Sequence, residues 1–234
     1  MEKLSVVIPT YNEVKRLPKT LSDVEAFLVE NFPGSEIIIS DGASQDGTVE
    51  YIKSYHSKIP IILLTERKRE GKGYGVKQGV LKAKGDLILF MDADNSTTIS
   101  QLKKFLPYIN DADVLIASRY AGINPELKQN LMRRIIARAG NAFIRHLTGL
   151  KFNDTQCGFK LFKRPAAREI FAKLKTKGWG FDVEVLLWAK KSGFKVKEIP
   201  VKWRDAAGSQ LRSAQDSINV LREVILAYRY VNRS

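Results

Sequence analysis

The stretch Leu87-Ile88-Leu89-Phe90-Met91-Asp92-Ala93-Asp94 places two carboxylates directly after an uninterrupted apolar run. A run of this length is typical of a strand that is buried on both faces of a parallel sheet. Open α/β sheets bind ligands outside the carboxyl ends of their strands, so we expect Asp92 and Asp94 at a ligand-binding edge. Two carboxylates one residue apart can hold a hard divalent cation whose other ligands are phosphate oxygens. An Asp-x-Asp sequence is also a common plain turn, so this motif alone leaves both interpretations open.

Other apolar runs of strand length alternate with segments of helical periodicity along the chain. This alternation predicts βαβ units, and therefore an α/β fold with a mostly parallel sheet flanked by helices. The predicted strands are 5–9, 36–40, 59–65, 87–91, 114–118, 158–162 and 195–203, and the predicted helices of the second half are 130–147, 181–192 and 214–231. No repeat or low-complexity linker separates the two halves, so we predict a single domain over residues 1–234.

The amino-acid composition indicates a negatively charged binding partner. The 39 Lys and Arg residues exceed the 25 Asp and Glu residues, and the net charge of +14 favours a nucleotide, a nucleic acid or an anionic membrane surface. Cys157 is the only cysteine, which excludes an internal disulfide framework and fits a reducing compartment. No signal-peptide pattern precedes the first strand, and no apolar stretch approaches the ~18 residues that suggest a spanning helix. We therefore expect a cytoplasmic protein, soluble or peripheral on a membrane.

Polar turns follow the other predicted strands. The segment Pro9-Thr10-Tyr11-Asn12-Glu13 offers a ring that can stack on a base and acids that can accept from a base or ribose, or it merely caps a helix. Asp41 leaves its strand at the same edge of the sheet as Asp92. Gly71-Lys72-Gly73 begins a predicted helix, where backbone N–H groups and an ammonium can meet a diphosphate. It is not a Walker A loop, because no Ser or Thr follows the lysine.

Together these segments resemble the family 2 glycosyltransferases, which have the GT-A fold, and the resemblance covers nearly the whole chain. The segments 5–13, 41–48, 71–73 and 92–94 stand in that family's order and spacing. The second half resembles the polyprenyl-phosphate glycosyltransferases in segments 117–120, 133–134, 154–162 and 178–184. Among these, the run Asp-Thr-Gln-Cys-Gly-Phe-Lys-Leu-Phe at 154–162 is most similar to the dolichyl-phosphate β-glucosyltransferases, and the dolichyl-phosphate mannose synthases come second.

The resemblance implies a role for individual residues. The nucleotide sugar would be held by Pro9, Tyr11, Glu13, Asp41, Lys72, Asp92 and Ala93. A Mg²⁺ or Mn²⁺ ion would be bound by Asp92 and Asp94. The acceptor phosphate would be held by Arg119, Arg133, Arg134 and Arg204, and the catalytic residues would be Asp94, Arg119 and Arg133. Gln210 stands where relatives often carry a lysine near the phosphates, which leaves the charge of that loop to Arg204.

The chemistry favours a phosphate acceptor. A sugar hydroxyl needs a positioned general base, whereas a phosphate is already anionic at neutral pH and needs cations to hold it. The second half is rich in arginine, whose planar fork suits a phosphate, although Asp182 and Glu184 remain possible bases. We predict inverting transfer of a hexose, glucose from UDP-glucose in the first instance, to a polyprenyl or dolichyl phosphate. The alternatives are a GDP-mannose-dependent polyprenyl-phosphate mannose synthase and a family 2 transferase that acts on a sugar hydroxyl.

The predicted partners follow from this assignment. Residues 1–120 would bind the nucleotide sugar, and residues 121–234 would bind the acceptor through amphipathic helices at the membrane interface. A basic amphipathic helix such as 130–147 can lie in that interface, or can simply pack in the core. We expect a peripheral protein on the cytoplasmic face of a membrane, docked by its own surface or by a membrane partner protein. A nucleic-acid-binding module would also explain the charge, but no helix-turn-helix, zinc-finger or RNP pattern is present, so we expect no nucleic acid.

Overall fold

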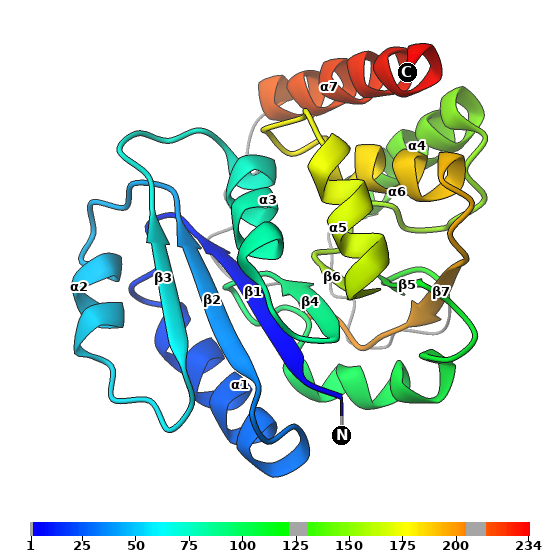
Figure 1. Cartoon of the computed structure of the whole chain (residues 1–234). Coiled ribbons are helices and arrows are strands. Elements are labelled where there is room, and N and C mark those ends of the chain that lie inside the picture. The colour runs from blue at the N-terminus through cyan, green and yellow to red at the C-terminus, as the bar shows by residue number, and fades with distance from the viewer. Residues whose placement is uncertain (1, 122–130, 205–213) are drawn as a thin grey trace.

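The computed structural model describes residues 2–121, 131–204 and 214–234, without the side chains of residues 131–139 and 214–217. Within these residues seven strands form one sheet in the order β3-β2-β1-β4-β6-β5-β7 (Figure 1). The strands are β1 (Leu4–Thr10), β2 (Glu36–Asp41), β3 (Ile61–Thr65), β4 (Leu87–Met91), β5 (Val114–Ser118), β6 (Phe159–Lys163) and β7 (Val196–Pro200). All neighbours pair in parallel except β6, which is antiparallel to β4 and β5. The prediction of a mostly parallel α/β sheet is confirmed.

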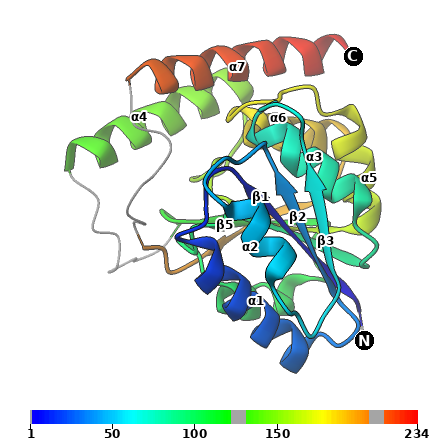
Figure 2. The same cartoon turned by 90° about the vertical axis from the view of Figure 1, so that its left-hand side faces the viewer.

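Helices cover both faces of this sheet (Figures 1 and 2). On one face α1, α2 and the 3₁₀ helix η1 pack their apolar side chains on the strands, and on the other face α3, α5 and α6 do so. A further layer is added by α7, which packs on α6 and lies beside α4 in both views. The helices are α1 (Leu17–Asn31), α2 (Thr48–Ser54), α3 (Lys72–Lys82), η1 (Ile99–Lys104), η2 (Leu106–Tyr108), α4 (Leu131–Thr148), α5 (Arg164–Lys173), α6 (Phe181–Lys191) and α7 (Ala214–Arg233). Among the helices described, each is too short or too polar to cross a membrane.

The strand β4 is buried along its whole length, as the apolar run predicts. It lies in the middle of the sheet, where both of its faces are covered by helices and its backbone pairs with β1 and β6. Such burial explains why five consecutive apolar residues stand here instead of an alternating pattern. The carboxylates of Asp92 and Asp94 therefore leave the sheet at its central strand.

The position of β6 could not be inferred from its sequence. Its antiparallel direction sets Phe159 opposite Met91, so the N-terminal end of β6 meets the carboxyl end of β4. The Asp92 N–H donates to the Gly158 carbonyl at 3.0 Å, and a Cβ on Gly158 would lie only 2.0 Å from the Asp92 carboxylate. Glycine is required at this close approach, and the 154–158 segment is thereby brought to the same edge of the sheet as Asp92.

Other predicted boundaries differ from the structure for local reasons. The third strand begins at Ile61 instead of 59, because Pro60 has no N–H to donate to the ladder. The last strand ends at Pro200 instead of 203, because the chain then turns to η1, where the Lys202 N–H donates to Gln101 Oε1 at 2.9 Å. The helix α5 is absent from the predicted elements, although its apolar residues Ala166, Ile170 and Phe171 have helical spacing and are buried.

Candidate active site

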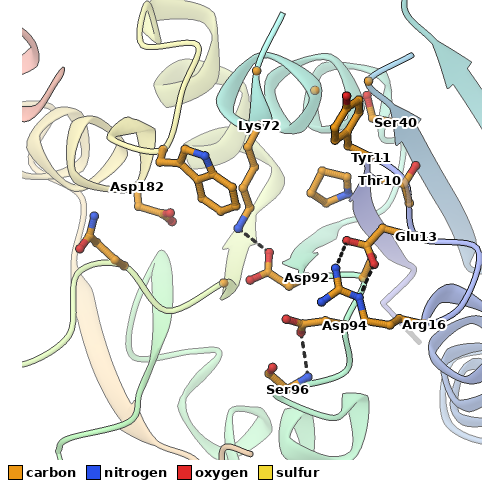
Figure 3. Close-up of a pocket in the computed structure, with 18 of the residues that line it drawn as sticks. Thr10, Tyr11, Glu13, Arg16, Ser40, Lys72, Asp92, Asp94, Ser96 and Asp182 are labelled. Carbon is orange, nitrogen blue, oxygen red and sulfur yellow. Dashed lines mark hydrogen bonds and ion pairs between the residues drawn. The ribbon is translucent and has the colours of Figure 1, made fainter. Parts of the chain in front are cut away.

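A pocket lies at the carboxyl ends of β1, β2 and β4, the edge at which the sequence predicts a ligand (Figure 3). Several residues predicted to bind the donor or the metal line it together with one predicted to bind the acceptor: Pro9, Tyr11, Glu13, Lys72, Asp92, Ala93, Asp94 and Arg119. The pocket also contains side chains to which the sequence assigned no ligand-binding role, namely Arg16, Ser40, Glu66, Arg69, Gln156, Trp179 and Trp203. Pro9 and Trp203, which are 194 positions apart in the chain, thus share one cavity.

The carboxylates after β4 form the polar floor of this pocket. Asp92 Oδ1 forms an ion pair with Lys72 Nζ at 2.6 Å, and Asp94 Oδ1 accepts a hydrogen bond from the Ser96 N–H at 2.9 Å. Burial raises the pKa of Asp92, and the charge of Lys72 acts in the opposite direction. Burial would lower the pKa of Lys72, but Asp92 and Asp182 outweigh this effect and raise it, so the ammonium keeps its proton at neutral pH.

The placement of Lys72 follows from its helix. Lys72 is the first residue of α3, and its ammonium lies 4.7 Å from the centre of the Trp179 ring and 5.4 Å from that of Phe90. The ammonium is therefore held between aromatic faces and a carboxylate, which stabilises its charge away from bulk water. A positive group at a helix N-terminus beside two acids can meet the negative charge of a diphosphate.

The turn after β1 forms the opposite wall. Arg69 stacks over the Tyr11 ring at 3.9 Å, and Arg16 forms an ion pair with Glu13, with Nε 2.6 Å from Oε2. Burial raises the pKa of Glu13, although Arg16 acts in the opposite direction. The turn is held by the next loop, because the Asn12 N–H donates to Ser44 Oγ at 2.8 Å. Asn12 itself has a φ of 56°, a left-handed conformation that Asn tolerates better than most residues.

Asp41 occupies a different place from the other predicted residues. It is fully buried and does not line the pocket, whereas its neighbours Ser40 and Gly42 do. The Asp41 carboxylate accepts from Thr10 Oγ1 at 2.8 Å, from the Ser44 N–H at 2.9 Å and from Ser44 Oγ at 2.6 Å. These bonds join the turns after β1 and β2. Asp41 therefore stabilises the wall of the pocket without lining it.

Glu66 is the pocket carboxylate that sequence reasoning missed. Its Oε2 accepts the Glu70 N–H at 3.0 Å, while its buried Oε1 has no hydrogen-bond partner among the described residues. Burial raises the pKa of Glu66. The signal that could have identified it is the one that identified Asp92, because Glu66 directly follows β3 at the carboxyl edge of the sheet.

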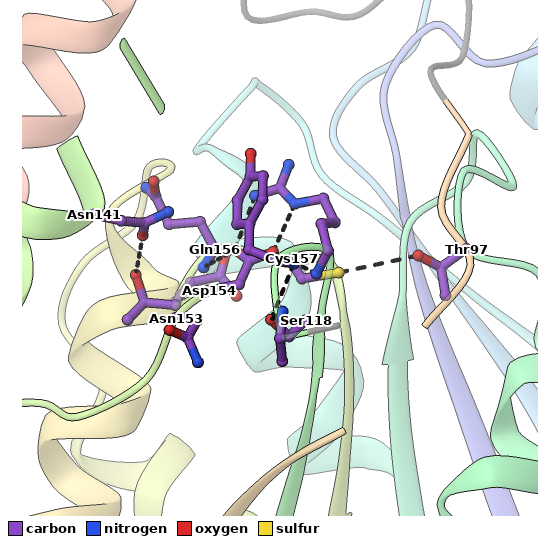
Figure 4. A network of polar contacts seen from close by, with 12 residues as sticks. Thr97, Ser118, Asn141, Asn153, Asp154, Gln156 and Cys157 are labelled. Carbon is purple, nitrogen blue, oxygen red and sulfur yellow. Dashed lines mark hydrogen bonds and ion pairs between the residues drawn. The ribbon is translucent and has the colours of Figure 1, made fainter. Parts of the chain in front are cut away.

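Arg119 reaches the pocket from the end of β5. It forms a two-bond ion pair with the fully buried Asp154, with Nε 2.7 Å from Oδ2 and Nη2 2.9 Å from Oδ1. Figure 4 shows Asp154 within a polar network that also contains Asn153, Gln156 and Cys157. Burial acts to raise the pKa of Asp154, but the Arg119 guanidinium outweighs it and lowers the pKa.

The other predicted acceptor arginines are not assigned to the pocket by the described part of the structure. Arg133 and Arg134 belong to α4, but their side chains lie outside the described part of the structure. Arg204 is exposed, and its N–H donates to the Ser96 carbonyl at 2.9 Å, which places its backbone beside the Asp94 turn. Their role toward a phosphate stays a prediction.

The two candidate bases differ in their surroundings. Asp182 lines the pocket but forms a buried ion pair with Lys160. Glu184 is fully buried and accepts from the Lys175 N–H at 2.8 Å, the Thr176 N–H at 2.7 Å and Trp188 Nε1 at 3.1 Å. Glu184 therefore holds the segment before α6 in place, and Asp182 reaches the cavity as part of a neutralised pair.

The carboxylates of Asp92 and Asp94 suit a hard divalent cation, because both are oxygen donors on one turn at the floor of the pocket. The Lys72 ammonium pairs with Asp92 Oδ1, so an ion bound here would share that carboxylate with Lys72. No cluster of three or more His, Cys, Asp or Glu side chains suited to a metal ion occurs among the residues that the structure describes.

Comparison with known proteins places the chain in a family. Residues 5–171 match the glycosyl transferase family 2 profile. The dolichyl-phosphate β-glucosyltransferase of Dictyostelium discoideum is 35% identical over 244 residues, which cover 97% of this chain and 75% of that protein. The enzyme of the same name from Saccharomyces cerevisiae is 34% identical over 95% of this chain and 73% of its own length.

Solved structures share the fold at low sequence identity. Mannosyl-3-phosphoglycerate synthase from Rubrobacter xylanophilus superposes with a TM-score of 0.76 at 18% identity, covering 100% of this chain and 76% of that one. Glucosyl-3-phosphoglycerate synthase from Mycobacterium tuberculosis, in complex with Mn²⁺, UDP-glucose and glycerol 3-phosphate, has a TM-score of 0.73 at 16% identity, with coverages of 97% and 80%. These likenesses confirm the GT-A type of fold. With the pocket at the carboxyl edge of its sheet and a family match over most of its length, this chain is a glycosyltransferase and belongs to glycosyl transferase family 2.

Proposed function

We propose that this glycosyltransferase transfers glucose from UDP-glucose to a dolichyl or related polyprenyl phosphate, with inversion at the anomeric carbon. The observation that carries the proposal is that Asp92, Lys72 and Arg119 line one pocket, with Lys72 paired to Asp92. The names of the relatives support the transferred sugar and the acceptor, because several of them are dolichyl-phosphate β-glucosyltransferases that are similar over most of the chain. We further propose that residues 1–234 act as one domain, in which 1–120 hold the donor and 121–234 hold the acceptor.

The donor would lie with its base near the Tyr11 turn and its diphosphate over Asp92. The arrangement of the pocket supports this orientation, because Thr10, Tyr11 and Ser40 lie together on one side of Lys72 and Asp92 (Figure 3). The unpartnered Oε1 of Glu66 would accept the N–H of the base, since a buried carboxylate oxygen gains most from a donor. Pro9 and Glu13 would contact the nucleoside, and Asp41 would act through the turns that it joins.

A divalent ion, Mg²⁺ or Mn²⁺, would be held by Asp92 and Asp94. The glucosyl-3-phosphoglycerate synthase solved with Mn²⁺ and UDP-glucose has the same fold, which supports a metal-dependent reaction here. When bound, such an ion neutralises charge on the departing diphosphate as a Lewis acid. Lys72 supplies a second positive charge at the same place and needs no change of protonation to do so.

The acceptor would attack as a phosphate without a general base. The surroundings of the two candidate bases support a reaction without a base. Asp182 forms an ion pair with Lys160, and Glu184 accepts hydrogen bonds from three N–H groups. A phosphate monoester is already ionised at neutral pH, so the protein needs only to bind and orient it. Arg119 would do so from the wall of the pocket, together with Arg133, Arg134 and Arg204.

We also propose that the protein docks peripherally on the cytoplasmic face of a membrane. The acceptor's polyprenyl chain requires a lipid surface. The helices α4 and α7 lie side by side (Figure 2), and both carry exposed apolar side chains. Phe143 is 42% exposed, Ile218 59% and Leu226 57%. Basic residues on these helices would add attraction to anionic headgroups, worth about 1 kcal/mol for each Lys or Arg near the surface.

A donor and acceptor panel tests the proposed function. Purified protein in detergent would be offered UDP-glucose, GDP-mannose and related sugars, each with a polyprenyl phosphate, with a soluble glycan, and with Mn²⁺ or a chelator. We expect glucosyl polyprenyl phosphate to form from UDP-glucose and polyprenyl phosphate when Mn²⁺ is present. No other donor and acceptor pair should give a product, and the chelator should abolish the reaction. Formation of a mannosyl lipid from GDP-mannose would show that the donor is not UDP-glucose. Transfer to the soluble glycan would contradict the lipid acceptor.

A further inference from the structure

We propose that Glu223 of α7 is a positioning residue that holds the turn Gly178-Trp179-Gly180 against the donor pocket. The inference rests on the proposed function, since it concerns how that donor site is kept in shape. Glu223 Oε2 accepts the Gly180 N–H at 2.7 Å. The bond links two segments that are 43 residues apart, and it brings the C-terminal helix into contact with a wall of the pocket.

The two glycines make this contact possible. A Cβ on Gly178 would lie 2.0 Å from Glu223 Oε1, and a Cβ on Gly180 would lie 2.7 Å from the Glu223 Cβ. Real Cβ atoms essentially never approach other atoms so closely, so the Glu223 side chain occupies the space that a Cβ on either glycine would need. Trp179 stands between these glycines, and its side chain lines the pocket. The sequence Gly-Trp-Gly thus fits a turn whose glycines contact Glu223 and whose tryptophan lines the pocket.

The same turn also contacts the first turn of α3, which carries Lys72. The Gly73 N–H donates to the Gly178 carbonyl at 3.3 Å, and the Tyr74 N–H donates to the Lys177 carbonyl at 3.1 Å. A Cβ on Gly73 would lie 2.6 Å from the Phe181 Cβ, so here too the backbones approach closely. Residues 177–180 are therefore packed between α7 and α3.

Direct contacts then lead from the clamp to the polar floor of the pocket. The Lys72 ammonium lies 4.7 Å from the Trp179 ring and 2.6 Å from Asp92 Oδ1. If the turn shifts, the aromatic face that stabilises the ammonium shifts with it. Glu223 is not among the described residues that line the pocket, so its influence on the donor must pass through the turn.

The attachment of α7 does not depend on Glu223 alone. Val224, Ala227 and Val231 are buried against the rest of the protein, and Lys191 Nζ donates to the Val231 carbonyl. These contacts should keep the helix in place when the Glu223 side chain is changed. Variants at this position therefore test the clamp separately from the fold.

The test compares UDP-glucose binding by calorimetry, with Mn²⁺ present, for the wild type, Glu223→Ala and Glu223→Gln. Glu223→Ala leaves the Gly180 N–H without its acceptor and should weaken binding about 5- to 30-fold. Glu223→Gln keeps an oxygen that can accept this bond, so it should bind within about threefold of the wild type. Arg222→Gln, on the exposed side of the same helix, serves as the matched control and should bind normally.

A second measurement separates positioning from general destabilisation. Trp179→Phe would be combined with Glu223→Ala; if the clamp acts through the turn, the double variant should bind only slightly worse than the poorer single variant. Independent, multiplying losses would overturn the proposal, as would wild-type binding by Glu223→Ala. If Glu223→Ala does not fold, Glu223→Asp, which keeps the charge but shortens the reach, takes its place with the same expected loss. Absence of nucleotide binding by the wild type itself would contradict the proposed function instead.

Discussion

Arg119 and Asp154 form a two-bond ion pair in which Nε and Nη2 of the guanidinium face both carboxylate oxygens, at 2.7 and 2.9 Å. The Arg119 N–H also donates to Asp154 Oδ2, at 3.0 Å. Such a pair fixes the guanidinium in one orientation, because its planar fork matches the carboxylate. Arg119 therefore stands at the pocket wall partly neutralised, and one arginine supplies less than a full charge for an acceptor phosphate. Further cations of the second half are then needed for that task.

Asp154→Asn should destabilise the protein strongly. Removing one partner leaves a largely buried Arg119 without its counter-charge, which costs about 3–5 kcal/mol when a buried pair is broken. Asp86→Asn is the matched control, because its pair with Arg164 is about half exposed and should contribute less than about 1 kcal/mol. Urea unfolding at neutral pH measures both changes.

The same pair predicts how stability depends on pH. The pKa of Asp154 is lowered in the folded protein, so its stabilising effect is complete above the unfolded pKa of about 4 and is lost as the pH falls through the lower folded value. The difference between wild type and Asp154→Asn should therefore shrink in acid. A difference that stays constant as the pH falls from neutral to well below the unfolded pKa would contradict the assigned charge.

Asp94→Asn should abolish most of the activity while the fold remains intact. The change removes a negatively charged ligand of the proposed metal, so catalysis should fall by about 100-fold or more. Direct Mn²⁺ binding, followed by electron paramagnetic resonance, should weaken in parallel. Asp111→Asn, at an exposed position, is the control. Unchanged Mn²⁺ affinity in Asp94→Asn would place the metal elsewhere.

Arg133→Ala should weaken use of the acceptor more than binding of the donor. A lost charge-assisted contact to phosphate corresponds to about a 10- to 100-fold rise in the KM for polyprenyl phosphate. The dissociation constant for UDP-glucose should stay near that of the wild type. Equal losses for both ligands would mean that Arg133 serves the donor or the fold. Lys53→Ala, at an exposed position of α2, provides the comparison.

Glu66 should recognise the N–H group of the base. UDP methylated at N3 of uracil lacks that donor, so the wild type should bind it about 10-fold more weakly or worse than UDP. In Glu66→Ala the preference between the two ligands should disappear, because the acceptor is gone from both complexes. A preference that survives in Glu66→Ala would assign the base contact to another group, and Asp41→Asn would then be the variant to examine.

Cys157 should be inert to alkylation in the folded protein. Burial raises the pKa of its thiol to about 12, so almost no thiolate is present at pH 8. Iodoacetamide should react slowly with native protein and rapidly in urea, as mass spectrometry can follow. Because the unfolded thiol ionises near pH 9 and the folded one does not, stability from this group is lost as the pH rises above about 9. Rapid alkylation of the native protein at pH 8 would contradict this burial.

Much of the sheet could be predicted because its signals are local. The runs at β4 and β5 have the predicted bounds exactly where apolar residues stop and polar turns begin. The direction of β6 could not be predicted, since the apolar pattern of Phe159–Lys163 does not specify whether the strand runs parallel or antiparallel to its neighbours. Pairing with β4 on one side and β5 on the other decides it. The short helix α5 was missed because it follows β6 without an intervening loop.

The amino-acid sequence by itself determined that acids and a lysine-bearing helix start would gather at the carboxyl edge of a parallel sheet. Asp92, Asp94 and Lys72 do so, because strand ends and helix starts are set by residues close in the chain. Only the tertiary structure decided the partners of each charge. Asp41 is bound to Thr10 and Ser44, Arg119 to Asp154, and Glu223 to Gly180. One buried oxygen of Glu66 has no hydrogen-bond partner among the described residues. A side chain's partner depends on segments that meet only after folding, and the energy of burying a charge depends on that partner.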